Sequence, residues 1–170
     1  MPSVVLQQVS SPFARSNAAG TLEKDVAIKY LVKYLDPLTE ASLESIAPDG
    51  LIRIWGAKAE RAHQFAKMPP KNSFVLFRRG RFVYAHGVIA ETTVNERLAE
   101  SLWGKDTDGE TWPLIFFLRK FTVFKKKKDA GRFNVILGRK STDNWQGLTV
   151  VPVKDSPKLQ EYFARELGEA

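Results

Sequence analysis

Short runs of β-branched and aromatic residues, separated by helical segments in irregular order, place the tightest limit on the fold of this chain. The runs 74–77 and 81–89 flank Arg78-Arg79-Gly80, a pattern that predicts a β-hairpin. Further strands are predicted at 51–55, 112–118, 133–136 and 148–151. Because the strands do not alternate strictly with helices, a dinucleotide-binding α/β fold is disfavoured. The sequence predicts an α+β domain built on a curved sheet or small barrel.

Helical spacing of apolar residues predicts the remaining elements. These helices cover 21–35, 38–46, 59–68, 94–103 and 155–167. Residues 1–20, rich in Ser, Ala and Pro, are expected to form a loosely ordered lead-in. No repeat or linker divides the rest of the sequence, so residues 21–170 are expected to form a single domain with an N-terminal helical extension.

Composition disfavours several classes of protein. The chain has 170 residues, enough for one domain with a core, and no cysteine, which leaves out disulfides, thiol nucleophiles and Cys-rich zinc sites. No run approaches the ~20 apolar residues of a membrane span, and the N-terminus lacks the basic start and apolar core of a secretory signal. We therefore expect a cytoplasmic protein with no membrane partner.

The basic residues are concentrated in one segment. The chain carries a formal net charge of +7. Residues 119–140 hold nine Lys or Arg and a single acid, Asp129, whereas residues 91–110 hold six acids and two bases. This asymmetry predicts a positive face that attracts the phosphates of nucleic acids. The alternative is that the run Lys125-Lys126-Lys127-Lys128 is a solvated loop that only raises solubility.

Residues suited to catalysis or metal binding are scarce. His63 and His86 fall in different predicted elements, and neither belongs to an HxH or HxxxH pair. The sequence contains no GxSxG elbow and no phosphate-binding GxxxxGK(S/T) loop. Asp106, Asp108 and Glu110 could bind a divalent cation weakly, but a solvated turn is the favoured interpretation. We expect no enzyme activity, no cofactor and no metal site.

Four tryptophans are candidates for contacts with bases. Trp112 and Trp145 are assigned to the core. Trp55 ends a predicted strand and Trp103 ends a predicted helix, so both indoles are expected at loop edges near the basic surface. Two such walls would each contribute about 1–3 kcal/mol of stacking on a planar base, which could offset the few kcal/mol needed to flip a base out of a duplex.

Several short motifs resemble the EVE domain of the PUA-like superfamily and the related YTH domains. These motifs are Ile54-Trp55-Gly56-Ala57-Lys58, the stretch from Ala62 to Met68, Ser73-Phe74-Val75-Leu76-Phe77, Gly87-Val88-Ile89, Ser101-Leu102-Trp103-Gly104, Trp112 to Leu118, Gly138-Arg139-Lys140 and Gln146-Gly147-Leu148. The resemblance spans about 51–152, and the chain looks most like the DNA-binding N-terminal domains of McrB-type modification-dependent restriction proteins. Two positions depart from the EVE pattern, because Asn72-Ser73 stands in place of Gly-Asp and Arg78 in place of an aromatic.

The resemblance implies a PUA-like fold, a curved sheet or pseudobarrel flanked by helices, with a cage for a flipped, methylated base. On its motifs, Trp55 and Trp103 would be the cage walls, and Gly56 would offer backbone groups to the base edge. It implies a non-enzymatic reader of methylated DNA, with N6-methyladenine the first ligand and 5-methylcytosine the second. The AAA+ motor and the nuclease of such a restriction system would come from other regions or chains.

Phosphate contacts are expected from seven basic residues: Arg79, Arg81, Lys125, Lys126, Lys127, Lys128 and Arg139. Two alternatives stay open. One is a module of the same superfamily that reads methylated or structured RNA instead of DNA. The other is a protein-interaction domain whose tryptophans are all in the core and whose lysine run is only solubilising. An enzyme acting on a flipped base is disfavoured, because the sequence offers no plausible acid–base pair or metal site.

Overall fold

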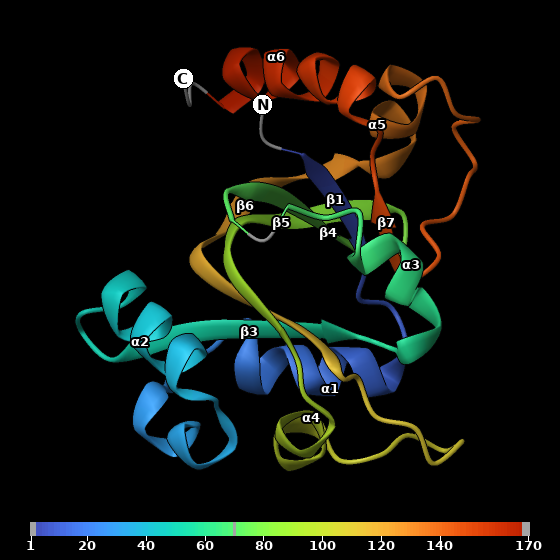
Figure 1. Ribbon diagram of the computed structural model, residues 1–170. Helices are drawn as coiled ribbons and strands as arrows, with labels where there is room; N and C mark the ends of the chain where they lie inside the picture. Colours follow the sequence, from blue (N-terminus) through green and yellow to red (C-terminus); the bar gives the residue numbers. More distant parts are fainter. Residues whose placement is uncertain (1–2, 70, 168–170) are drawn as a thin grey trace.

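The centre of the computed structural model, which describes residues 3–69 and 71–167, is a curved, open sheet of seven strands (Figure 1). The strands are β1 (Val4–Gln8), β2 (Val26–Ala27), β3 (Leu51–Ala57), β4 (Ser73–Arg79), β5 (Phe82–Val94), β6 (Leu114–Asp129) and β7 (Leu148–Val150). They lie in the order β2-β3-β6-β5-β4-β1-β7. β1 and β4 are parallel, and every other neighbouring pair is antiparallel. Because β2 and β7 lie at opposite edges, the sheet does not close into a barrel.

The described residues form six α-helices: α1 (Pro12–Thr21), α2 (Pro37–Ile46), α3 (Ala62–Phe65), α4 (Glu96–Trp103), α5 (Ala130–Ile136) and α6 (Ser156–Leu167). Polar side chains set several helix starts by accepting hydrogen bonds from backbone N–H groups that have no partner within the helix. Ser11 Oγ accepts from Ala14 N at 3.1 Å, and Asn95 Oδ1 accepts from Leu98 N at 2.9 Å. Among the described helices, none is long and apolar enough to cross a lipid bilayer.

The sheet separates two hydrophobic cores. Side chains of successive strand residues point to opposite faces, so Val5 lies in one core and its neighbours Val4 and Leu6 lie in the other. The first core packs under α1 and α4 and contains three of the four tryptophans. The second packs under α5 and α6. In Figure 1, α1 and α4 lie below the sheet, and α5 and α6 lie above it.

The predicted lead-in is wrong for residues 3–20. β1 lies inside the sheet between β4 and β7, its residues Val4 to Leu6 are fully buried, and α1 follows it directly. The five residues of β1 give no clear strand signal in the sequence, because the partners that bury them come from much later in the chain. The helix predicted at 21–35 is also wrong: α1 ends at Thr21, and the segment forms β2 and two single 3-10 turns at 28–30 and 32–34. Its apolar residues are buried in the first core at intervals close to those of a helix, and this spacing led to the wrong prediction.

The region after the predicted strand 112–118 differs from expectation as well. The lysine run is not a loop, because β6 extends through it to Asp129. The strand predicted at 133–136 is instead part of α5, because Asp129 Oδ1 accepts from Gly131 N at 2.8 Å and caps a helix there. The helix predicted at 59–68 is reduced to a 3-10 turn at 59–61 followed by α3.

The other predicted elements are confirmed with small shifts at their ends. They are the helices at 38–46, 94–103 and 155–167, the strands at 51–55 and 148–151, the first part of β6 predicted at 112–118, and the hairpin made by β4 and β5. The α+β class and the curved sheet flanked by helices are confirmed too.

Candidate nucleic-acid interface

Trp55, Trp103 and Trp112 form one cluster inside the first core, here called the tryptophan cluster. The ring centroid of Trp55 lies 6.4 Å from that of Trp103 and 5.1 Å from that of Trp112, and the centroids of Trp103 and Trp112 are 5.6 Å apart. The Trp55 ring meets the other two edge to face, at 66° and 63°, and the Trp103 and Trp112 planes are tilted by 52°. The three residues are 1%, 7% and 8% exposed.

The expected position of the Trp55 and Trp103 indoles at loop edges is therefore wrong, whereas the cage of Trp55, Gly56 and Trp103 stays a prediction. β3 does not end at Trp55 but continues to Ala57, and Gly56 pairs with Ile115 of β6. Trp103 Nε1 donates to Thr21 Oγ1 at 3.0 Å, which fixes this indole in the core. Two crossed, buried rings in mutual contact leave no parallel slot between them for a base. The assignment of Trp112 and Trp145 to the core is confirmed.

The lysine run projects from an irregularity in the pairing of β5 with β6. Val83 pairs with Lys128, but the next pair on this ladder joins Ala85 to Val123. β6 therefore carries extra residues opposite Tyr84, and such a bulge bends the strand and redirects its side chains. Phe124 turns inward and is buried, whereas the three residues after it, Lys125, Lys126 and Lys127, are exposed. We call these three residues the lysine bulge.

The other predicted phosphate-binding residues divide into engaged and exposed side chains. Arg79 donates to Glu23 at 2.6 Å and its guanidinium lies 4.3 Å from the Tyr84 ring centroid, so its charge is already compensated. Arg139 lies 3.5 Å from Asp143, and Lys128 is only half-exposed. Arg81, by contrast, is exposed and stands 5.5 Å from the Phe82 ring centroid. The Phe82 ring also lies 5.9 Å from Lys127 Nζ, so it connects Arg81 with the lysine bulge.

Next to Arg81, a pocket of about 800 Å³ opens between the β4–β5 turn, α5 and α6. Its charged lining consists of Arg78, Arg81, Arg132, Arg165 and Asp129, and we call it the arginine pocket. Only Arg81 was predicted as a site residue from the sequence. The one signal of Arg78 in the sequence is its departure from the EVE pattern. The sequence does not reveal the pocket, because its residues come from segments that are distant along the chain.

The buried member of the pocket is Arg78, which is 8% exposed. Its Nε donates to Gly80 O at 2.8 Å, Nη1 to Asp143 O at 2.9 Å and Nη2 to Asn144 Oδ1 at 3.4 Å. All three acceptors are uncharged, and burial lowers the pKa of this guanidinium, although Asp129 opposes that shift. Among the described residues no carboxylate is in contact with Arg78, so it is a desolvated cation that an incoming anion would stabilise.

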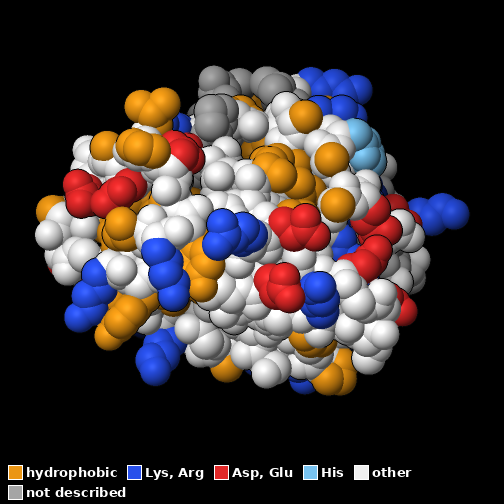
Figure 2. Space-filling view, turned by 60° about the horizontal axis from the view of Figure 1, so that its bottom comes forward, with side chains coloured by type: hydrophobic (Ala, Val, Ile, Leu, Met, Phe, Trp, Pro, Cys, Tyr) orange, Lys and Arg blue, Asp and Glu red, His pale blue; other side chains and the backbone are white. Residues whose placement is uncertain are grey.

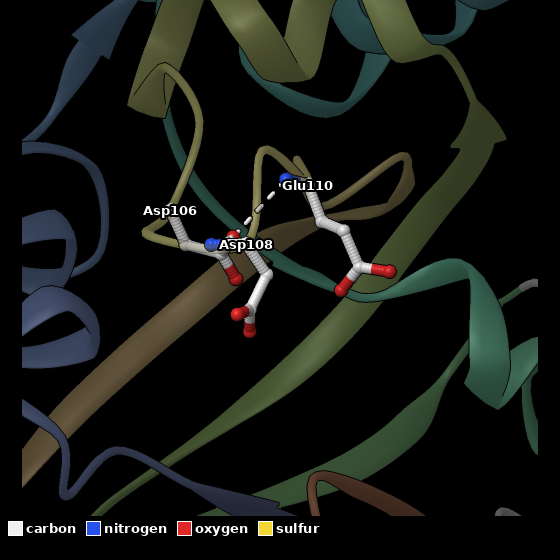
Figure 3. A group of neighbouring side chains, drawn as sticks. All are labelled: Asp106, Asp108 and Glu110. Atoms are coloured by element: carbon white, nitrogen blue, oxygen red, sulfur yellow. Dashed lines mark hydrogen bonds between the residues drawn. The ribbon is translucent and has the colours of Figure 1, made fainter.

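The acidic residues of the segment 91–110 gather away from this surface. Figure 3 shows Asp106, Asp108 and Glu110 on one loop, with Asp106 Oδ1 accepting from Glu110 N at 3.0 Å. Their carboxylate oxygens lie within 4.8 Å of one another. Lys58 Nζ contacts Asp106 at 2.6 Å and Glu110 at 2.9 Å, and the hydrogen bonds that it donates to these two carboxylates raise the pKa of Lys58. The Lys58 ammonium group therefore occupies the position that a metal cation would take between these carboxylates. The loop is a turn held by ion pairs.

The charges are separated across the molecule. The acidic loop at 104–113 lies at the bottom of Figure 1, on the side of α1 and α4, whereas the arginine pocket lies at the top, beside α5 and α6. Figure 2 brings the α1 and α4 side forward, and acidic and basic side chains are interspersed on that face. The concentrated positive surface is thus on the opposite side, where the lysine bulge adjoins the arginine pocket.

Comparison with known proteins identifies the fold. No family model matches the chain, and no curated protein matches its sequence. Among solved structures, the chain is similar to the N-terminal domain of Thermococcus gammatolerans McrB bound to m5C DNA, with a TM-score of 0.71. The alignment covers 97% of this chain and 99% of that one at 18% sequence identity. The likeness shows that the two chains share a fold, and it agrees with the α+β class and the curved sheet flanked by helices that the sequence predicts.

Proposed function

We propose that this chain is a non-enzymatic module that binds DNA through the lysine bulge and the arginine pocket, and that it favours DNA carrying a methylated base. The observation that carries this proposal is the gathering of exposed cations on one side of the fold, opposite the acidic loop. A surface of this kind attracts the phosphate backbone and orients the duplex, and it does so for any base sequence.

The preference for a methylated base is supported by the similar McrB domain, which was solved with DNA that contains m5C. Its ligand makes 5-methylcytosine the first modification to test here, ahead of the N6-methyladenine expected from the sequence. We extend the proposal to partners: an AAA+ motor and a nuclease, supplied by other polypeptide regions or chains, would act on the DNA that this module selects.

The test is binding to three duplexes of one sequence, which are unmodified, 5-methylcytosine-containing or N6-methyladenine-containing. Affinities are measured at about 150 mM salt, close to physiological ionic strength. The wild-type protein is compared with a variant in which Lys125, Lys126 and Lys127 are replaced by alanine. A matched control replaces three exposed lysines elsewhere, Lys24, Lys29 and Lys33, and so removes the same charge.

We expect tighter binding of the 5-methylcytosine duplex by the wild-type protein. The lysine-bulge variant should bind all three duplexes more weakly by a similar factor, because phosphate contacts carry no information about the base. The control variant should retain most of the affinity. Equal binding of all three duplexes by the wild-type protein would refute the methyl preference, and stronger binding of RNA of the same sequence would assign the module to RNA instead.

A further inference from the structure

The arginine pocket brings four guanidinium groups together with one carboxylate. Arg78 and Arg81 come from the hairpin of β4 and β5, Arg132 from α5, and Arg165 from α6. The carboxylate of Asp129 already accepts a hydrogen bond from Gly131 N at 2.8 Å at the start of α5. The positive charge of the pocket therefore exceeds its negative charge, and an anion would be attracted into it.

Arg78 supplies the desolvated donor that distinguishes this pocket from a merely basic surface. A guanidinium carries five N–H groups, and the structure assigns acceptors to three donor atoms of Arg78, all of them uncharged oxygens. The other two N–H groups have no acceptor assigned among the described residues, and Arg78 lines the pocket. The contacts with Asp143 and Asn144 also hold the guanidinium in place, so little side-chain entropy is lost when a ligand binds.

The pocket also has apolar lining residues. They are Val135 and Ile136 of α5, together with Tyr162 of α6. The Tyr162 ring packs edge to face on Phe133 at 5.2 Å between centroids, which fixes that side of the pocket against the second core. Val135 is 62% exposed, so its side chain is accessible to a ligand in the pocket.

A pocket lined by both guanidinium groups and apolar side chains offers contacts to the two halves of a nucleotide, its phosphate and its base. We propose that the arginine pocket binds a single nucleotide, with its phosphate on Arg78, Arg81 and Arg132 and its base against Val135 and Ile136. The nucleotide can be free in solution or part of a DNA strand. Only the second source rests on the DNA-binding function proposed above, so the two claims can fail separately.

The experiment is calorimetric titration of the full chain in a buffer without phosphate or sulfate. Deoxycytidine 5′-monophosphate is compared with deoxycytidine and with inorganic phosphate. Arg132→Glu tests the pocket, because this side chain is exposed and its replacement leaves the core intact. Arg97→Glu is the charge-matched control, because Arg97 is an exposed residue of α4, at the other side of the sheet. Amide NMR spectra recorded during the titration locate the site.

We expect the monophosphate to bind more tightly than either the nucleoside or inorganic phosphate, since each of those fills one half of the pocket. Arg132→Glu should weaken binding of the monophosphate about tenfold or more, the usual effect of losing one charge-assisted contact. Arg97→Glu should change it less than about twofold. Amide signals of Gly131 and Ser141, which line the pocket, should shift, whereas that of Gly109 should not.

Equal affinity for the monophosphate and the nucleoside, or a monophosphate affinity that is indifferent to Arg132→Glu, would overturn the proposal. A duplex with one unpaired cytidine separates the sources: displacement of the monophosphate indicates a nucleotide within DNA, and no displacement indicates a free one. If no duplex binds but the monophosphate does, the pocket stands and the DNA-binding function fails. If a duplex binds but the monophosphate does not, the DNA-binding function stands and the pocket proposal fails.

Discussion

The indole of Trp103 fills the space that a side chain at Gly56 would occupy. A Cβ built on Gly56 would lie 2.7 Å from Cζ3 of Trp103 and 3.0 Å from the carbonyl oxygen of Trp112. Real Cβ atoms do not approach carbon atoms this closely, so the tryptophan cluster can pack against β3 only because residue 56 has no side chain. This contact explains the Trp-Gly pair by packing instead of ligand binding.

Gly56→Ala is accordingly expected to destabilise the protein by about 1–3 kcal/mol, the usual cost of overpacking a close-packed core. Urea denaturation followed by tryptophan fluorescence measures this loss. Gly20→Ala is the matched control, because the residue lies within α1 and a Cβ added there would meet no atom within 4 Å beyond its own helix backbone. There alanine should stabilise the helix by about 0.5–1 kcal/mol. A Gly56→Ala protein as stable as wild type would contradict the packing account.

Trp55→Phe distinguishes a core tryptophan from a wall of a base-binding cage. Trp55 is 1% exposed, and its Nε1 has no hydrogen-bond partner among the described residues. Phenylalanine should therefore cost only packing, about 1–3 kcal/mol of stability. The ratio of affinities for methylated and unmethylated duplexes should not change at a temperature where the variant is folded. Loss of that ratio in a variant with wild-type stability would restore the cage interpretation.

The ion pair between Lys58 and Asp106 predicts a pH-dependent contribution to stability. The hydrogen bond from Lys58, followed by the backbone N–H of Glu110, lowers the pKa of the Asp106 carboxyl. Because this pKa is lower in the folded than in the unfolded chain, the contribution is present above the ordinary carboxyl range and is lost as the pH falls through the folded-state value. Carbon-13 NMR titration should show the Asp106 pKa rising towards its ordinary value in Lys58→Gln.

Lys105→Gln is the control for that titration. Lys105 lies in the same loop but pairs with Glu100, at 3.5 Å. Its replacement should leave the Asp106 pKa close to the wild-type value. An Asp106 pKa that is equally low with and without Lys58 would show that the backbone hydrogen bonds alone hold it down.

The salt dependence of DNA binding tests whether the lysine bulge touches phosphates. The slope of log affinity against log salt concentration changes by about 0.9 for each phosphate contact to duplex DNA. Replacing Lys125, Lys126 and Lys127 by alanine should make that slope shallower by roughly this amount for each lysine in contact. The triple variant of Lys24, Lys29 and Lys33 should keep the wild-type slope; if both variants flatten it equally, binding is diffuse and not centred on the bulge.

Local sequence patterns predicted those elements whose partners are near in the chain. The hairpin of β4 and β5 turns at Gly80, which has a φ of 59°, and its alternating residues fill both cores. α2 begins at Asp36-Pro37, whose cap and fixed φ are visible in the sequence. In α5, by contrast, the β-branched Val135 and Ile136 are typical of a strand. The segment forms a helix, which Asp129 caps at its start.

The candidate site was less predictable, because it depends on contacts between distant segments. Whether an indole is buried is a property of its neighbours, and β6 and α1 supply those neighbours for Trp55 and Trp103. Composition indicated a positive face but could not separate Arg79, which is paired with Glu23, from Arg81, which is exposed. The joining of Arg78, Arg132 and Arg165 in one pocket follows from the tertiary fold alone.

The position of β1 has a consequence for how the protein is made. Val4 pairs with Phe74 on one side, and Val5 pairs with Val150 on the other. β1 is therefore synthesised well before β4 and β7, and it can take its place in the sheet only after they have been made. Folding of the sheet cannot be completed during translation until β7 has emerged. Loss of the first strand would leave β4 and β7 as open edges, available for pairing with other chains.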